Sequence, residues 1–321
     1  MEQHMQIIIS IIISFIITLV LGPLLIPVLK KVKAGQSIRE EGPQSHKTKA
    51  GTPTMGGVMI IAAVVITSIS AGSINNDLII LLFSLIIFGI VGFIDDFIKV
   101  VLKRNLGLRA YQKLLFQIAF AVMIAVYQAN VSAFGTQIYI PIVDVYWDFG
   151  IFYIPFIAFF VVCMVNSVNL TDGLDGLASG VTLLVALFLS LIALSLGYMS
   201  TAMFCGALTG ACLGFLNFNA FPAKIFMGDT GSMALGGAIA AAAILMNLTL
   251  IIPIVGGIYL IETLSVVLQV LFYKKTGRRL FKMSPLHHHF ELSGWKETRV
   301  VGVFWGATLV LCIIGRIILM R

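Results

Sequence analysis

Five aspartates lie where an apolar chain can least easily carry charge. They are Asp95 and Asp96 in GFIDDFIK, Asp172 and Asp175 in NLTDGLDG, and Asp229 in FMGDTGS. Each stands at the end of a long apolar run or just beyond it. An unpaired carboxylate near hydrocarbon is costly, so such residues usually face a partner or a polar cavity. Several carboxylates with few cations beside them indicate that a metal ion supplies the missing charge.

The donor types narrow the choice of metal. Carboxylate oxygens without cysteine or suitably spaced histidine select a hard cation. Magnesium uses one or two carboxylates and leaves its other positions to water and substrate phosphates. With basic loops nearby, the sequence predicts a Mg²⁺-dependent polyphosphate site, where phosphoryl transfer needs mostly positioning and charge neutralisation. Two alternatives stay open. Asp229 could have no role beyond capping a helix, and Asp95 and Asp96 could be solvated residues at a helix end.

Other polar segments could complete such a site. Asn169, Asp172 and Asp175 follow one another at intervals of three, which places neighbours on one helix face. Phe226 could stack on a planar base or pack in the core. The segment 29–55 ends in HKTKAGTPTMGG, which suits phosphate contact but lacks the spacing of a P-loop.

Three consecutive histidines occur in SPLHHHFE. A zinc site usually has ligands three or four residues apart, so three adjacent histidines do not favour zinc. Contact with phosphate or sugar and a structural role are the remaining interpretations of His287 and His288.

The elements that carry these residues are membrane spans. Of the 321 residues, 59% are hydrophobic and 11% charged, which excludes a soluble globular domain and a disordered chain. Apolar runs of about 17 to 25 residues are long enough to cross a bilayer. We predict an all-α polytopic membrane protein, with residues 1–321 as one integral-membrane domain and a short external hairpin within 130–150. The ten predicted spans are 6–28, 56–73, 78–98, 111–129, 151–168, 176–196, 201–218, 232–247, 250–272 and 300–319.

The basic residues orient these spans. Of the 21 lysines and arginines, 19 fall in segments 29–55, 99–113, 217–231 and 273–299. With ten spans these segments share one face, and the positive-inside rule makes that face cytoplasmic. Both termini are then external, and all five aspartates lie on the cytoplasmic side. The net charge of +7 fits topology and anionic lipid as well as an anionic substrate, and we expect no nucleic-acid partner.

The polar motifs of this sequence, taken together, resemble those of a known family. GFIDDFIK, NSVNLTDGLDGLA, NFNAFPAKIFMGDTGS and SPLHHHFE, in this order, resemble the polyprenyl-phosphate N-acetylhexosamine-1-phosphate transferases. Within them, QSIREEGPQSHKTKAGTPTMGG and PLHHHFE are similar to the phospho-N-acetylmuramoyl-pentapeptide transferases, the lipid I synthases. The resemblance runs from about Gly22 to the last span.

This resemblance implies a reaction in the bacterial plasma membrane, with the active site on its cytoplasmic face. UDP-MurNAc-pentapeptide and undecaprenyl phosphate would give lipid I and UMP in the first membrane step of peptidoglycan synthesis, with Mg²⁺. A homodimer is also implied. Direct attack by the lipid phosphate and a covalent intermediate both stay open, and we favour direct attack.

The resemblance also assigns residues. Asp95 matches a base for the lipid phosphate, Asp96 and Asp229 match residues at the metal, and His287 matches a catalytic histidine. Positions matching substrate contacts are Lys49, Thr54, Asn169, Asp172, Asp175, Asn219, Phe226, Gln269 and His288.

Three rival functions remain. A sister transferase would use UDP-GlcNAc, although the PLHHHFE and TPTMGG segments argue against it. A secondary transporter would carry its charges near the midplane of the membrane, whereas here they gather at one face. A non-catalytic scaffold is the third alternative.

Overall fold

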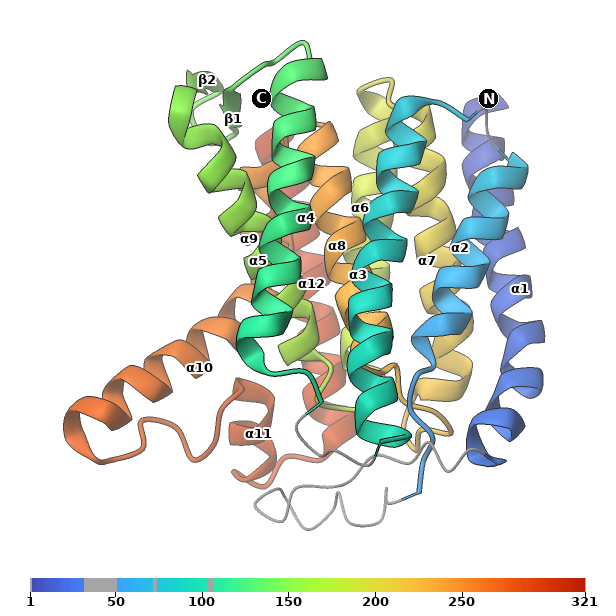
Figure 1. The fold of residues 1–321 in the computed structure, drawn as a ribbon, viewed down its shortest axis with the longest axis vertical. Helices are drawn as coiled ribbons and strands as arrows, with labels where there is room; N and C mark the ends of the chain where they lie inside the picture. Colours follow the sequence, from blue (N-terminus) through green and yellow to red (C-terminus); the bar gives the residue numbers. More distant parts are fainter. Residues whose placement is uncertain (1, 32–50, 72–73, 103–106, 321) are drawn as a thin grey trace.

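The protein is a bundle of long helices with one small hairpin (Figure 1). The computed structural model describes residues 2–31, 51–71, 74–102 and 107–320. Its elements are α1 (Glu2–Lys31), α2 (Gly57–Ala71), α3 (Asn76–Val100), α4 (Ala110–Val131), β1 (Gln137–Ile140), β2 (Val145–Asp148), η2 (Gly150–Phe152), α5 (Tyr153–Thr171), α6 (Leu177–Ser195), α7 (Met199–Asn219), α8 (Gly228–Leu245), η3 (Thr249–Ile251), α9 (Ile252–Val255), α10 (Gly257–Thr276), α11 (Leu286–Glu291) and α12 (Glu297–Leu319).

The predicted polytopic all-α class is confirmed. In the part of the chain that the structure describes, nine helices are long and apolar enough to cross a membrane, and α2 is a shorter apolar helix of 15 residues. Nine of the predicted spans each correspond to one of these ten helices, and the span 250–272 takes in η3, α9 and most of α10. The first helix begins and α12 ends at the same end of the bundle (Figure 1), as an even number of crossings requires. That this end is external remains a prediction.

The predicted span 250–272 differs from a single straight helix. The chain forms η3 and α9, breaks at Gly256, and restarts as α10, which runs outward from the bundle before the chain returns to α11 near the lower end of the bundle (Figure 1). Two adjacent glycines, Gly256 and Gly257, stand at the break, and each costs a helix interior about 1 kcal/mol relative to alanine. An apolar run alone does not reveal this change of direction.

The centre of the bundle is α8. In its apolar window 89% of the residues are buried, against 28% in α1, α4, α10 and α12. Its sequence, GDTGSMALGGAIAAAAIL, is mostly glycine, alanine, serine and threonine, and such small residues let other helices approach closely. A Cβ on Gly92 of α3 would lie 2.1 Å from the carbonyl oxygen of Asp229. Small residues therefore fix the α3–α8 spacing at the level of the aspartates.

The predicted hairpin is present. Strands β1 and β2 pair antiparallel, with Ile138 opposite Trp147. Asn247, just after α8, holds β1: its Oδ1 accepts from the backbone N–H of Tyr139 at 3.2 Å, and its Nδ2 donates to the carbonyl of Gln137 at 3.1 Å. The hairpin is thus fastened to the end of α8 opposite to Asp229.

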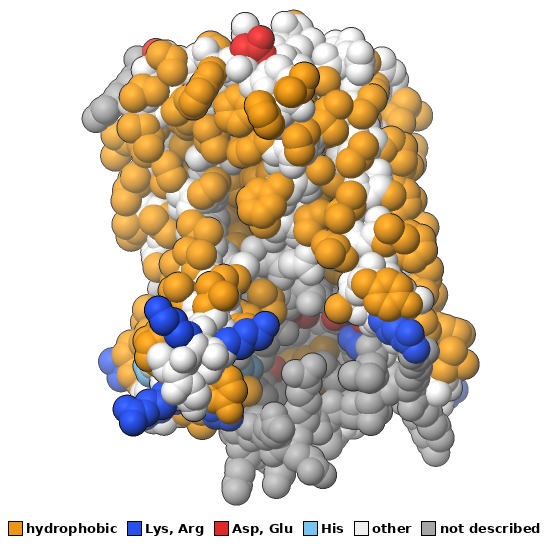
Figure 2. Space-filling view, turned by 60° about the vertical axis from the view of Figure 1, so that its left-hand side comes forward, with side chains coloured by type: hydrophobic (Ala, Val, Ile, Leu, Met, Phe, Trp, Pro, Cys, Tyr) orange, Lys and Arg blue, Asp and Glu red, His pale blue; other side chains and the backbone are white. Residues whose placement is uncertain are grey.

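Charge and apolar surface are separated along the bundle. Figure 2 shows hydrophobic side chains over the upper body and lysine and arginine side chains at the lower end, with acidic side chains in the recess between them. The five aspartates lie at this lower end, at the end of α3, between α5 and α6, and at the start of α8. The prediction that they share one face is confirmed.

Candidate functional site

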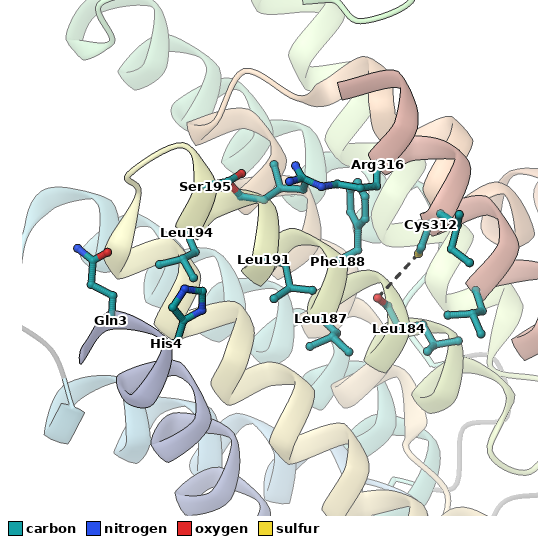
Figure 3. A pocket seen from close by; sticks show the side chains of 13 residues that line it. Gln3, His4, Leu184, Leu187, Phe188, Leu191, Leu194, Ser195, Cys312 and Arg316 are labelled. Atoms are coloured by element: carbon teal, nitrogen blue, oxygen red, sulfur yellow. Dashed lines mark hydrogen bonds between the residues drawn. The ribbon is translucent and has the colours of Figure 1, made fainter. Parts of the chain in front are cut away.

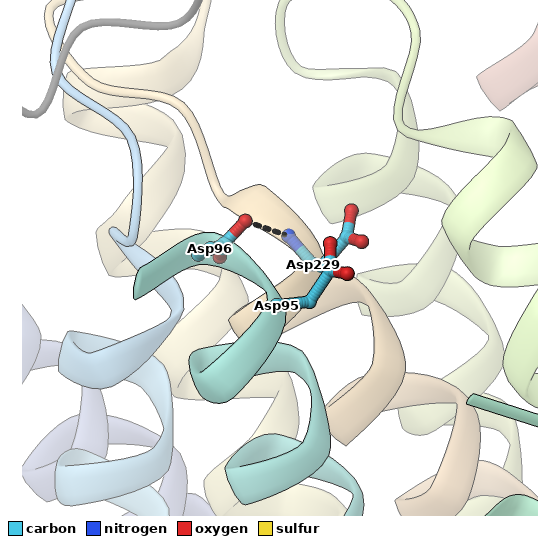
Figure 4. A group of neighbouring side chains, drawn as sticks. All are labelled: Asp95, Asp96 and Asp229. Atoms are coloured by element: carbon cyan, nitrogen blue, oxygen red, sulfur yellow. Dashed lines mark hydrogen bonds between the residues drawn. The ribbon is translucent and has the colours of Figure 1, made fainter. Parts of the chain in front are cut away.

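The carboxylates of Asp95 and Asp229 point to one place. Asp95 is buried in the last turns of α3 and Asp229 lies in the first turn of α8, so the close packing of these two helices brings the two residues together (Figure 4). One oxygen each from Asp95, Asp96 and Asp229 lies within 4.8 Å of the others. Three carboxylate oxygens at this spacing can hold a metal ion, and a purely oxygen donor set favours a hard one.

Two lysines neutralise this cluster. Lys99 Nζ lies 2.6 Å from Asp95 Oδ2 and 3.1 Å from Asp229 Oδ2, and Lys113 Nζ lies 2.9 Å and 2.5 Å from the same oxygens. Lys99 follows Asp95 by four residues on α3, whereas Lys113 comes from the start of α4. A divalent cation would compete with these two ammonium groups for the same carboxylates, and a phosphate would compete with the carboxylates for the ammonium groups.

Asp96 points the other way and caps α8 (Figure 4). Its Oδ1 accepts from the backbone N–H of Asp229 at 3.2 Å, and its Oδ2 accepts from the backbone N–H and the hydroxyl of Thr230 at 2.9 and 2.7 Å. A carboxylate at a helix N-terminus satisfies free N–H groups and complements the helix dipole. Asp96 therefore positions Asp229. Its predicted metal contact stays a prediction, since both of its oxygens already accept hydrogen bonds.

The C-terminal end of α5 adds a third side to the centre. Asn169 Nδ2 donates to Asp229 Oδ1 at 3.0 Å and to Ser232 Oγ at 2.8 Å. Asp172 ends the helix, and burial together with the negative charges of Asp229, Asp96 and Asp175 raises the pKa of Asp172 well above its ordinary value. The interval of three residues thus places Asn169 and Asp172 on the side of α5 that faces the aspartate centre.

His287 reaches the same turn from α11. Its ring is buried, and its Nε2 packs against Gly173 so closely that a Cβ at that position would lie 2.1 Å from Nε2. Glu262 of α10 holds it: Oε1 accepts from the His287 backbone N–H at 3.2 Å, and Oε2 lies 3.1 Å from Nδ1. Among described residues, His287 Nε2 has no hydrogen-bond partner, so it is available to a ligand at the turn.

Several predicted substrate residues make contacts within the protein. Asn219 Oδ1 accepts from the Gly176 N–H and the Ser179 hydroxyl, and its Nδ2 donates to the carbonyl of Ile225. Gln269 binds the backbone of residues 280 and 281 through both ends of its amide. These two side chains shape the loops of the site, and their predicted contact with substrate stays a prediction.

The remaining predicted residues surround the centre. Asp175 Oδ2 accepts from the Ala223 N–H at 2.9 Å. The Phe226 backbone N–H donates to the carbonyl of Pro53 at 2.8 Å, which brings buried Thr54 beside the start of α8. His288 Nδ1 lies 2.9 Å from Glu291 Oε2, and Lys49 is outside the described residues.

Sequence reasoning missed two residues of the site, Lys113 and Glu262. Lys99 entered the prediction as a neighbour that Asp95 or Asp96 could contact, whereas Lys113 was counted only within the basic segment 99–113. Glu262 was the stronger missed signal, because it is the single acidic residue inside the predicted span 250–272. An ionisable side chain within a span indicates a functional partner, and here that partner is His287.

A bundle of membrane-crossing helices with a carboxylate and lysine centre at one end fits an integral-membrane transferase of phosphate-bearing substrates. The glycosyl transferase family 4 model matches residues 78–247, and the phospho-N-acetylmuramoyl-pentapeptide-transferase signature 1 matches residues 49–61. The chain belongs to the phospho-N-acetylmuramoyl-pentapeptide transferases of this family.

Several relatives carry that name. The protein of Alkaliphilus oremlandii is 62% identical, over 98% of this chain and 98% of its own length. That of Alkaliphilus metalliredigens is 60% identical over 99% and 100%, and that of Clostridioides difficile is 54% identical over 89% of each chain.

Proposed function

We propose that this protein transfers phospho-MurNAc-pentapeptide from UDP-MurNAc-pentapeptide to undecaprenyl phosphate, giving lipid I and UMP. The observation that carries the proposal is the 62% identity along nearly the whole chain to a protein named phospho-N-acetylmuramoyl-pentapeptide-transferase. The position of the charged centre supports it. A site at the end of an apolar bundle suits one water-soluble and one lipid substrate.

In the proposed reaction, an oxygen of the lipid phosphate attacks the sugar-linked phosphorus of the UDP-sugar. A new phosphorus–oxygen bond forms, the bond to the UMP phosphate breaks, and UMP leaves with both electrons of that bond. Both ammonium groups contact Asp95 and Asp229, so a metal ion bound by these carboxylates would free Lys99 and Lys113 to balance the negative charge of the phosphates. Where the lipid phosphate arrives protonated, Asp95 would accept that proton.

We propose Mg²⁺ as the metal. Asp229 and Asp95 offer carboxylate oxygens within 4.8 Å of one another, and no histidine or cysteine belongs to this acidic cluster of described residues. That donor set fits Mg²⁺, which when bound would neutralise and orient the diphosphate. His287 and the turn at Asp172 would contact the sugar phosphate, and Phe226 would stack on the uracil.

The proposed setting is the bacterial plasma membrane, with the aspartates at its cytoplasmic face and a homodimer as the assembled form. The lower end of the bundle carries the lysines and arginines, which supports this orientation (Figure 2).

The test is UMP release by purified protein with undecaprenyl phosphate, comparing UDP-MurNAc-pentapeptide with UDP-GlcNAc, with and without Mg²⁺. We expect turnover only with the muramoyl substrate and Mg²⁺. Turnover restricted to UDP-GlcNAc would identify the sister activity instead. Asp229→Asn should abolish turnover in a folded protein, whereas Asp148→Asn on the distant hairpin should not.

A further inference from the structure

Two adjoining cavities lie at the end of the bundle opposite to the aspartates. The larger, of about 650 Å³, is an apolar groove between α1, α6 and α12, lined by leucines and Phe188 (Figure 3). The smaller, of about 340 Å³, lies beneath the β-hairpin. Both are lined by Ile192, Ser195 and Arg316, and Figure 3 shows the Arg316 side chain extending towards Ser195. The groove therefore leads directly into the smaller cavity.

Aromatic rings and one carboxylate form the hairpin side of the smaller cavity. Its lining includes Phe134, Tyr139, Tyr146, Tyr198 and Asp144. The rings of Phe134 and Tyr146 stack at 5.7 Å, and those of Tyr139 and Tyr146 lie 5.1 Å apart. Aromatic faces next to a carboxylate attract a cation, through the ring quadrupole and through direct ion pairing.

Asp144 and Arg316 bring opposite charges to one cavity. The carboxylate of Asp144 accepts a hydrogen bond from the hydroxyl of Tyr139 at 2.8 Å. Burial and this hydrogen bond raise the pKa of Tyr139 to about 12, so the hydroxyl remains a donor. Within residues 107–320 and the other described segments, Arg316 forms no hydrogen bond and no ion pair. The cavity thus offers a cationic group and an anionic group with capacity left for a ligand.

The hairpin wall is built without a ligand. Asn247 fixes the backbone of Tyr139 and Gln137 to the end of α8. Thr136 Oγ1 donates to Asp148 Oδ1 at 2.5 Å, which ties the base of the hairpin. A site held in place this way loses little conformational entropy when a ligand binds.

We propose that these two cavities bind one zwitterionic phospholipid with a primary ammonium headgroup, in the leaflet opposite to the aspartate site. Arg316 would contact the lipid phosphate, Asp144 and the tyrosine rings would hold the ammonium group, and an acyl chain would fill the apolar groove. The charge pattern selects this occupant. An anionic headgroup alone would leave Asp144 unpaired, and a soluble cation would use neither Arg316 nor the groove.

The test is native mass spectrometry of the delipidated protein with equal amounts of dioleoyl-phosphatidylethanolamine and dioleoyl-phosphatidylglycerol. We expect the ethanolamine lipid to be retained in preference. Asp144→Asn should lower the ratio of bound ethanolamine lipid to bound glycerol lipid about fivefold, the factor for about 1 kcal/mol in a partly exposed ion pair. Arg316→Gln should lower retention of both lipids and leave their ratio closer to the parent value.

The matched control is Asp148→Asn, which removes the same charge from the same hairpin outside the cavity lining. It should keep the parent ratio. Tyr146→Leu, which removes an exposed ring and no charge, should weaken retention of the ethanolamine lipid as well. Equal retention of the two lipids by the parent protein would overturn the proposal. An Asp148→Asn effect as large as that of Asp144→Asn would also overturn it.

Discussion

The contact between Glu262 and His287 makes a sharp prediction about which ring nitrogen carries the proton. As a carboxylate, Glu262 can only accept, and it accepts twice, from the backbone N–H and from Nδ1 of His287. The proton of neutral His287 is then on Nδ1, and Nε2 is an acceptor that faces Gly173 and the turn at Asp172.

Glu262→Gln should invert this arrangement without unfolding the protein. The backbone N–H of His287 can only donate a hydrogen bond, so it must pair with the single amide oxygen of the glutamine. The amide NH₂ then faces Nδ1 and moves the ring proton to Nε2. We expect turnover to fall about 10- to 100-fold, as for other partners that orient a functional histidine, with an almost unchanged melting temperature.

Glu262→Ala should instead damage the fold. The two side chains are 0% and 1% exposed, so the substitution leaves two buried donors without a partner. At about 1–3 kcal/mol for each orphaned group, the free energy of unfolding should fall by about 2–6 kcal/mol.

The assay is UMP release measured as kcat and KM, together with thermal unfolding of the purified protein. Glu291→Gln is the control, because it removes the same charge from the neighbouring His288, whose Nδ1 lies 2.9 Å from Glu291. Since His288 is predicted to contact substrate, this control should change KM more than kcat. If Glu262→Gln keeps the parent kcat, the orientation of His287 is not used in turnover and the reasoning fails.

Three further predictions test the centre. Gly92→Ala should lower the melting temperature and turnover, because its Cβ would lie 2.1 Å from a backbone oxygen of α8, whereas Gly306→Ala, with nothing within 4 Å, should be tolerated in both measurements. Added Mg²⁺ should raise the melting temperature by mass action, and the rise should disappear in Asp229→Asn but persist in Asp148→Asn. The pKa of Asp172 is higher in the folded protein than in the unfolded chain. The stability that Asp172 contributes is therefore fully present at pH values below the unfolded-state pKa, and it is lost as the pH rises through the folded-state pKa. Melting temperatures across a pH series should therefore fall more steeply for the parent than for Asp172→Asn, and parallel curves would contradict this.

Hydrophobic runs and basic segments predicted the spans and the shared face of the aspartates, because membrane crossing depends on length, hydropathy and charge that a sequence displays directly. The different roles of Asp95, which faces Asp229 and the lysines, and of Asp96, which caps α8, could not be predicted from length, hydropathy and charge. The sequence indicated that adjacent helical residues point about 100° apart. It did not show which of the two meets the N-terminus of α8, since that depends on how α3 and α8 pack through Gly92.

The break at Gly256 explains why Glu262 and His287 meet. Had residues 250–272 formed one straight span, Glu262 would lie inside the hydrocarbon layer, where an isolated carboxylate is unfavourable. The change of direction carries α10 out of the bundle, and the chain then returns to α11, whose His287 contacts Glu262 in the first half of α10 (Figure 1). The acidic residue in an apolar segment and the run of histidines are therefore related, because Glu262 and His287 are partners. Together they predict the partner, because the acid requires a donor and the nearest histidines follow in the next segment of the chain.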